Sequence, residues 1–215
     1  MVTAIDVAIL VPDPVKSLAI KLSRQINPPD FCLNNTDILP HVTLGMGFIP
    51  EDQIPNTKYQ ISNIVKNFRP FEVTVERLEA RYLVVRKSYE IEKLHRQITV
   101  QVDFVQPADF SGAYFKPGEE ISEETKKYTA NFKLKNSFGN YVPHITLGWD
   151  EEKGIKSIAA FGPHITSQTT EVDASVALRN IKSLPVSFTV DEIAICQLGE
   201  KNTCRKVLAQ IPLGV

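Results

Sequence analysis

Cysteine, glycine and long apolar runs are all scarce in this chain of 215 residues. Its 3 cysteines are too few for a disulfide framework, so we expect buried, reduced thiols in a cytosolic protein. No apolar run approaches the length that spans a bilayer. The first seven residues carry no basic cluster and include Asp6, which is unlike a signal peptide. We therefore expect a cytoplasmic protein without membrane association.

An excess of positive charge is also missing. The chain has 24 Lys and Arg against 25 Asp and Glu, which argues against wrapping duplex nucleic acid by bulk charge. This charge balance does not exclude the binding of a small anionic ligand in a local pocket. With only 10 glycines, neither GxGxxG nor GxxxxGK[ST] occurs, and HExxH and CxxC are missing too. Nucleoside triphosphate, zincin and thiol-redox functions therefore lose most of their support.

Apolar periodicity predicts a mixture of strands and helices with at least one hairpin. This mixture favours an α+β fold with mostly antiparallel sheets, and the length favours one domain over 1–215, built of two lobes. Asp13 before Pro14 predicts a capped start for the first helix. The expected strands cover 3–11, 40–48, 71–76, 80–87, 141–149, 186–198 and 203–213, and the expected helices 14–26, 61–68, 88–102, 121–132 and 152–161.

One hexapeptide occurs twice and stands well above the background. Pro40-His41-Val42-Thr43-Leu44-Gly45 returns as Pro143-His144-Ile145-Thr146-Leu147-Gly148, with five of six positions identical. The chain has only 4 histidines, so a repeat that contains a rare, titratable residue is hard to ascribe to packing.

Strand geometry predicts which side chains of the repeat act together, because residues i and i+2 point the same way. In the first copy His41 and Thr43 share a face with Gly45 and Gly47, and the apolar residues between them face the core. In the second copy His144, Thr146, Gly148 and Asp150 share a face, with Trp149 on the core side. Each strand is thus expected to offer an imidazole, a hydroxyl and then a bare backbone that a ligand can approach.

Two imidazoles with ordinary pKa values near about 6.5 suit paired acid–base catalysis near neutral pH. One takes a proton from water and the other supplies a proton to a leaving oxygen. The hydroxyls of Thr43 and Thr146 are expected to donate hydrogen bonds to phosphate oxygens. Two alternatives stay open: a two-histidine metal site completed by Asp6 or Asp150, and a module that binds RNA ends or nucleotides without turnover.

The two motif copies, the opening strand and helix and the closing strand pair resemble the 2H phosphoesterase superfamily, named for two histidines in two H-x-T/S-x motifs. Its members include RNA 2′,3′-cyclic phosphodiesterases and the so-called 2′-5′ RNA ligases. The resemblance implies two α+β lobes related by a pseudo-two-fold, with each motif on a central strand and both facing one cleft. It also implies a phosphodiesterase of the 2′,3′-cyclic or 2′-5′ class.

On this basis we expect His41, Thr43, His144 and Thr146 to be catalytic, with no metal and no cofactor. The expected partner is a nucleotide or RNA end with a cyclic phosphate or a 2′-5′ linkage. We expect a monomer with no obligate protein partner. The motif is symmetric, so it does not say which histidine is the acid, and no substrate-binding residue is assigned.

The remaining polar candidates are less specific. His164 lies in a third P-H-x-T without an apolar back face, so His144 is preferred as the second catalytic histidine. His95 lies on the apolar face of a helix and is expected to be hydrogen-bonded and partly buried. Asp6 is open between orienting a histidine, lining the cleft and facing solvent.

The pocket walls are expected to come from loops. These loops cover 27–39, 106–120 and 163–185, and none carries a readable specificity signal. Arg81, Arg86 and Lys87 are interpreted as solvated surface charge.

Overall fold

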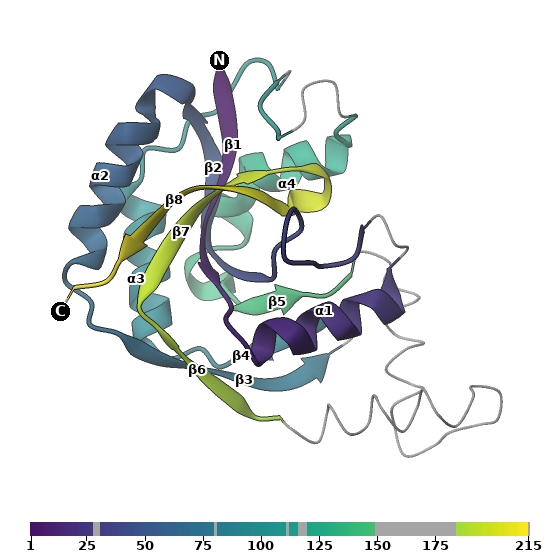
Figure 1. The fold of residues 1–215 in the computed structure, drawn as a ribbon. Helices are drawn as coiled ribbons and strands as arrows, with labels where there is room; N and C mark the ends of the chain where they lie inside the picture. Colours follow the sequence, from purple (N-terminus) through teal and green to yellow (C-terminus); the bar gives the residue numbers. More distant parts are fainter. Residues whose placement is uncertain (28–30, 80, 111, 116–119, 149–183, 215) are drawn as a thin grey trace.

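The computed structural model describes residues 1–27, 31–79, 81–110, 112–115, 120–148 and 184–214 (Figure 1). Within these residues, none of the helices is long and apolar enough to cross a bilayer. The expected helix 152–161 and most of the segment 163–185 lie outside the described residues. In chain order the elements are β1 (Val2–Leu10), α1 (Val15–Ile26), β2 (His41–Pro50), η2 (Glu51–Gln53), α2 (Ile54–Val65), β3 (Phe71–Glu79), β4 (Tyr82–Val85), α3 (Tyr89–Gln101), α4 (Glu123–Lys135), η3 (Phe138–Asn140), β5 (His144–Thr146), β6 (Val186–Val190), β7 (Glu192–Leu198), η4 (Glu200–Asn202) and β8 (Cys204–Pro212).

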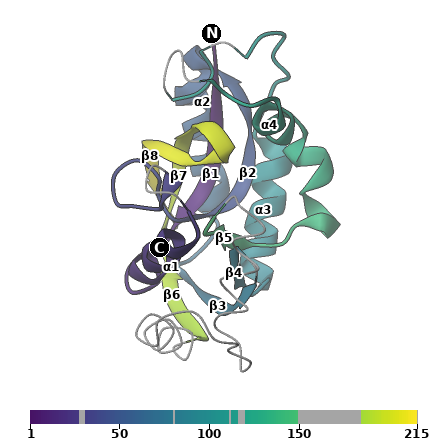
Figure 2. The same cartoon turned by 90° about the vertical axis from the view of Figure 1, so that its right-hand side faces the viewer.

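Two antiparallel four-stranded sheets form the framework. The strand order is β2-β1-β7-β8 in the first sheet and β5-β4-β3-β6 in the second. Helices flank both sheets, so the expected α+β class with antiparallel sheets is confirmed. Each histidine motif lies on the outermost described strand of its sheet, not on a central one, and these two strands, β2 and β5, pack against each other. In Figure 2 the first sheet lies above the second, and β5 is the strand of the second sheet that lies next to the first.

The segment expected as one strand over 186–198 is two strands in different sheets. β6 pairs with β3 in the second sheet, and β7 pairs with β1 and β8 in the first. Asp191 separates them, and its carbonyl accepts a hydrogen bond from the Leu213 amide at 2.7 Å. The alternation shifts by one residue here, because Val190 and Ile193 are buried and the two residues between them, Asp191 and Glu192, are both exposed. The single expected strand overlooked this signal. The chain therefore passes directly from one sheet to the other at this point.

Helices α1, α3 and α4 begin close to the expected positions, whereas α2 begins at Ile54, well before the expected 61, and ends before 68. In α1 the N-cap residue is Pro14, not Asp13, but the Asp13 carboxylate still accepts a hydrogen bond from the Ser17 amide at 3.1 Å. The hydroxyls of Ser88 and Ser122 cap α3 and α4 in the usual way. Each cap satisfies an amide that the helix itself leaves unpaired.

The main core lies between the sheets and α1, α2 and α3. It takes Ile5, Val7 and Ile9 from β1, which is the face of that strand that the alternation predicted. A second apolar cluster lies on the other face of the first sheet, where Met46 and Phe48 of β2 meet Phe132 of α4. This cluster fixes α4 against β2 and so places one wall of the site.

Candidate active site

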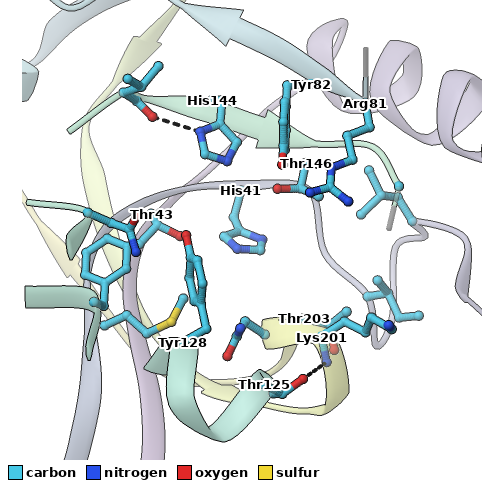
Figure 3. Close-up of a pocket in the computed structure, with 18 of the residues that line it drawn as sticks. His41, Thr43, Arg81, Tyr82, Thr125, Tyr128, His144, Thr146, Lys201 and Thr203 are labelled. Atoms are coloured by element: carbon cyan, nitrogen blue, oxygen red, sulfur yellow. Dashed lines mark hydrogen bonds between the residues drawn. The ribbon is translucent and has the colours of Figure 1, made fainter. Parts of the chain in front are cut away.

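Both copies of the repeated motif line one pocket. Its cavity volume is about 360 Å³, and His41, Thr43, His144 and Thr146 all contribute to the lining. Figure 3 shows the two imidazoles facing the same space from β2 and β5. Residues about one hundred positions apart therefore meet because the outer strands of two sheets pack together.

In the first copy both ring nitrogens of His41 have a partner. Nδ1 lies 2.7 Å from the Leu39 carbonyl, which only accepts, so Nδ1 carries a proton. Nε2 lies 3.2 Å from Oδ2 of Asp6. The hydroxyl of Thr43 also donates to Oδ2 of Asp6, at 2.7 Å. Asp6 is fully buried and joins the two motif residues from behind.

In the second copy the imidazole has a similar anchor but different surroundings. Nδ1 of His144 donates to the Val142 carbonyl at 2.8 Å, again two residues earlier in the chain. The ring of Tyr82 meets the imidazole edge to face, with centroids 4.5 Å apart. The shared anchor fixes the same tautomer on both rings and directs the chemistry to Nε2.

The two imidazoles differ in proton affinity. Burial lowers the pKa of His41, but the hydrogen bond and charge of Asp6 outweigh burial and raise it above the ordinary value. Burial lowers the pKa of His144, and the positive charges of His41 and Arg81 lower it further. For Asp6 itself, burial raises the pKa, and contacts with His41 and Thr43 offset only part of that rise. Near neutral pH these shifts favour a charged His41 and a neutral His144.

A β-bulge in β2 corrects the expected assignment of faces. Val7 of β1 pairs with Gly45 and Ala8 pairs with Thr43, so Leu44 is the extra residue. Beyond the bulge the alternation is reversed, and Met46 lines the pocket with His41. The expectation that Gly45 and Gly47 extend the ligand face is therefore wrong.

The two glycines instead allow close packing on the core side. A Cβ at Gly45 would lie 2.8 Å from Cγ2 of Ile98, and one at Gly47 would lie 2.6 Å from the ring of Phe104. Gly148 does line the pocket, as expected, and a Cβ there would lie 2.4 Å from Cγ2 of Ile26. Gly148 thus has a packing role in addition to its place in the pocket lining.

Two side chains hold the bulge in place. The Tyr141 hydroxyl donates to the Thr43 carbonyl at 2.8 Å, and Nδ1 of His95 donates to the Leu44 carbonyl at 2.6 Å. Nε2 of His95 accepts from the Phe138 amide at 3.1 Å, and its ring stacks on Tyr141 with centroids 3.7 Å apart. The expectation of a hydrogen-bonded His95 is confirmed, although the residue is fully and not partly buried.

One wall of the pocket comes from α4 and the η4 turn, which were not expected to contribute. Glu200 is buried and accepts hydrogen bonds from the Ser122 amide and hydroxyl and from the Thr125 hydroxyl, at 2.7–3.1 Å. These hydrogen bonds join η4 to the start of α4 and place Tyr128 and Lys201 along the pocket lining. Of the loops expected to form walls, 27–39 contributes and no residue of the described parts of 106–120 does. A tyrosine and a lysine in separate polar segments gave no sequence signal.

The opposite wall carries Arg81 and Tyr82. Arg81 lines the pocket, so its interpretation as solvated surface charge is wrong, and its Nε donates to the Tyr82 hydroxyl at 2.8 Å. The same interpretation holds for Arg86 and Lys87, which form ion pairs with Glu76 and Glu92 outside the pocket. Figure 3 shows Arg81 and Lys201 on opposite sides of the pocket.

The described residues supply no group of three or more His, Cys, Asp or Glu side chains that could hold a metal ion. Asp6, one candidate third ligand, is instead engaged with His41 and Thr43. Asp150, Trp149 and His164 lie outside the described residues.

Comparison with known proteins identifies the family. The family model described as the 2′-5′ RNA ligase superfamily matches residues 34–202. No curated protein matches the chain in a sequence comparison. Among solved structures, TT0787 of Thermus thermophilus is similar with a TM-score of 0.55 at 14% identity over 98% of each chain. Escherichia coli LigT complexed with 3′-AMP gives 0.50 at 14%, and a structure named as a phosphoesterase gives 0.50 at 13%, both over 100% of each chain. The solved structures share the fold, and the family model spans both motif copies: the chain belongs to the 2′-5′ RNA ligase superfamily of 2H phosphoesterases.

Proposed function

We propose that this chain is a metal-independent phosphodiesterase. It hydrolyses a 2′,3′-cyclic phosphate or a 2′-5′ phosphodiester of a nucleotide or RNA end by two-histidine acid–base catalysis. The observation that carries the proposal is the meeting of both His-x-Thr copies in one pocket. Membership of the 2H phosphoesterase superfamily supports the reaction class.

The site residues have complementary tasks in this reaction. One imidazole takes the proton of the attacking water, and the other protonates the ribose oxygen that leaves phosphorus. Thr146 lies at the lining, where its hydroxyl can donate to a phosphate oxygen. The Thr43 hydroxyl donates to Asp6 and therefore acts mainly on Asp6 and its neighbour His41. A strained five-membered cyclic phosphate needs no metal for these steps.

The pocket suits a small nucleotide or the end of a chain. A volume of about 360 Å³ is near the lower end of the range for small-molecule sites. The lining combines the aromatic rings of Tyr82 and Tyr128 with the cations of Arg81 and Lys201. Rings can stack on a base, and cations can contact phosphate.

The test is a substrate panel assayed for turnover with and without chelator. It contains 2′,3′-cyclic mononucleotides, ADP-ribose 1″,2″-cyclic phosphate, and 2′-5′ and 3′-5′ dinucleotides. We expect chelator-insensitive hydrolysis of a cyclic or 2′-5′ member. Loss of activity with chelator would favour the two-histidine metal hydrolase instead. Binding without product, unchanged in His41→Ala, would favour the non-catalytic module.

The proposal extends to how the protein works in the cell. We propose a cytoplasmic monomer, one bilobal domain over 1–215, that acts on its nucleotide or RNA-end substrate without a membrane or an obligate protein partner. Size-exclusion chromatography with light scattering tests the monomer, because a dimer would double the measured mass.

A further inference from the structure

The pocket continues into a second cavity beside α4. This cavity, the α4 groove, has a volume of about 410 Å³ and is lined by Glu124, Lys127, Tyr128, Asn131, Lys135 and Asn136. Glu124, Tyr128 and Asn136 also line the pocket that holds both motif copies. Because the two cavities share three residues, a ligand bound at the histidines can extend directly into the α4 groove.

The α4 groove runs along one face of the helix. Lys127, Asn131 and Lys135 follow one another at intervals of four residues, which places them in a row on the surface of α4. Phe132, on another face, is buried in the core cluster against β2. Figure 2 shows α4 along one edge of the molecule, beside β2. From Lys127 to Lys135 the helix rises by about 12 Å, which is longer than one phosphate group.

The two lysines of this row have no carboxylate partner within ion-pair distance. Lys126, on a neighbouring face, pairs with Glu123 at 2.7 Å. Within the described part of the chain, Lys127 and Lys135 form no ion pair and donate no side-chain hydrogen bond. Both side chains are exposed, so their ammonium groups are open to an anionic ligand.

Positive charge is concentrated along the joined cavities. Among their described lining residues, Glu124 is the one carboxylate, against the cations of Arg81, Lys127, Lys135 and Lys201. The chain as a whole has a formal net charge of -1. The path from the histidines along α4 therefore favours a ligand with several negative charges.

An aromatic ring lies where the two cavities meet. Tyr128 is 40% exposed, and its ring contacts Phe132 edge to face with centroids 6.1 Å apart. Rings that stack on bases, combined with cations that contact phosphates, are typical of sites for single-stranded nucleic acid. A diphosphate is compact, whereas the phosphates of a strand are separated by ribose units. Lysines about 12 Å apart along a helix therefore fit a strand better than a diphosphate.

We propose that the α4 groove binds the nucleotides on the 5′ side of the reacting one, with Lys127 and Lys135 as contacts to their phosphates. The substrate is then the end of a short RNA strand that carries the cyclic phosphate, and not a free cyclic mononucleotide. This inference rests on the proposed function and names its substrate class. Tyr128 offers its ring to a base at the boundary between the pocket and the α4 groove.

The test compares two substrates with the same reacting group, adenosine 2′,3′-cyclic phosphate and a triadenylate that ends in a 2′,3′-cyclic phosphate. In the wild type we expect kcat/KM to be about 10-fold higher or more for the trinucleotide, mainly through a lower KM. Lys127→Gln/Lys135→Gln should remove this advantage and change the mononucleotide by less than about 2-fold. The slope of log kcat/KM against log salt should become shallower for the trinucleotide, by about 0.7 for each lost phosphate contact.

The matched control is Lys58→Gln/Lys133→Gln, which removes the same charge from exposed lysines outside both cavities. It should leave the preference for the trinucleotide unchanged. An equal loss in the control would assign the effect to bulk charge, and equal kcat/KM for the two substrates in the wild type would overturn the proposal. ADP-ribose 1″,2″-cyclic phosphate carries a diphosphate and no strand. A larger effect of the groove variant on this compound than on the trinucleotide would also overturn the proposal.

Calorimetric binding of the reaction products separates this proposal from the proposed function. The probes are triadenylate with a terminal 2′-phosphate and adenosine 2′-monophosphate. We expect the trinucleotide to bind the wild type about 10-fold more tightly, and the groove variant to lose the difference. If this difference holds but no member of the panel is hydrolysed, the proposed function fails and the α4 groove still binds a strand. If hydrolysis proceeds without any preference for the strand, the inference about the α4 groove fails alone.

Discussion

Replacing His95 with alanine should destabilise the fold and impair the site from outside the pocket. The change leaves two backbone groups without partners, the buried Leu44 carbonyl and the partly buried Phe138 amide. Each such orphaned group costs about 1–3 kcal/mol. The lost stack on Tyr141 costs about 0.5–1.5 kcal/mol more. We therefore expect the free energy of unfolding to fall by roughly 3–6 kcal/mol, a large share of the 5–15 kcal/mol typical of a domain.

Urea unfolding followed by circular dichroism measures this loss. The matched control is His144→Ala, whose side chain is only half-buried at the pocket and should cost less than about 1 kcal/mol. The His95 variant should also show lower activity, because Leu44 is the bulged residue beside Thr43. A loss of stability below about 1 kcal/mol would refute the view that this histidine holds the bulge.

The dependence on pH gives an independent check on His95. Its Nδ1 donates and its Nε2 accepts, so only the neutral ring fits, and burial lowers its pKa. The unfolded chain then binds this proton more readily than the folded one. The contribution of His95 is complete above about pH 6.5 and declines as pH falls below that value. The stability difference between wild type and His95→Ala should shrink from about pH 7.5 to about pH 5.5, and an equal difference at both values would contradict the argument.

Four further outcomes are expected. His41→Ala and His144→Ala should each lower the rate by about 10²–10⁴-fold in the panel assay, and full activity in either would remove that residue from the mechanism. The profile of kcat/KM against pH should be bell-shaped, with limbs that belong to the coupled pair; a rate that rises steadily with pH would not fit. Thr146→Val should lower the maximum of kcat/KM about 10²-fold and leave the apparent pKa values of both limbs unchanged, since it removes a hydrogen-bond donor and no titrating group. A shift of either limb would contradict this role. Gly148→Ala should lower the unfolding free energy by about 1–3 kcal/mol in urea, because its Cβ would lie 2.4 Å from Cγ2 of Ile26; unchanged stability would mean that α1 moves freely.

Much of the fold could be predicted because local patterns agreed with it. The alternation in β1 placed Ile5 and Val7 on the core face, and serine caps marked α3 and α4. The break at Asp191 was missed although Asp191 and Glu192, two adjacent exposed residues, interrupt the alternation there; only the pairing partners show that the two strands belong to different sheets. The α4 wall was missed because Tyr128 and Lys201 reach the pocket of the motif only through the hydrogen bonds that Glu200 makes with the start of α4.

The sequence by itself determined the chemical groups of the site. A repeated His-x-Thr in a chain with 4 histidines selected His41, Thr43, His144 and Thr146, and all four line one pocket. It also determined that histidine and threonine alternate with core residues, since that follows from the period of a strand.

Only the tertiary structure decided how the two copies differ. The bulge at Leu44 shifts the pairing of β2 by one residue and places His41 and Thr43 on the same face as Asp6. Without it the period of two would continue, and the motif would face away from Asp6. The bulge depends on bonds from His95 and Tyr141, which are distant in sequence. Pairing between strands is a property of partners, so one strand read alone cannot show it.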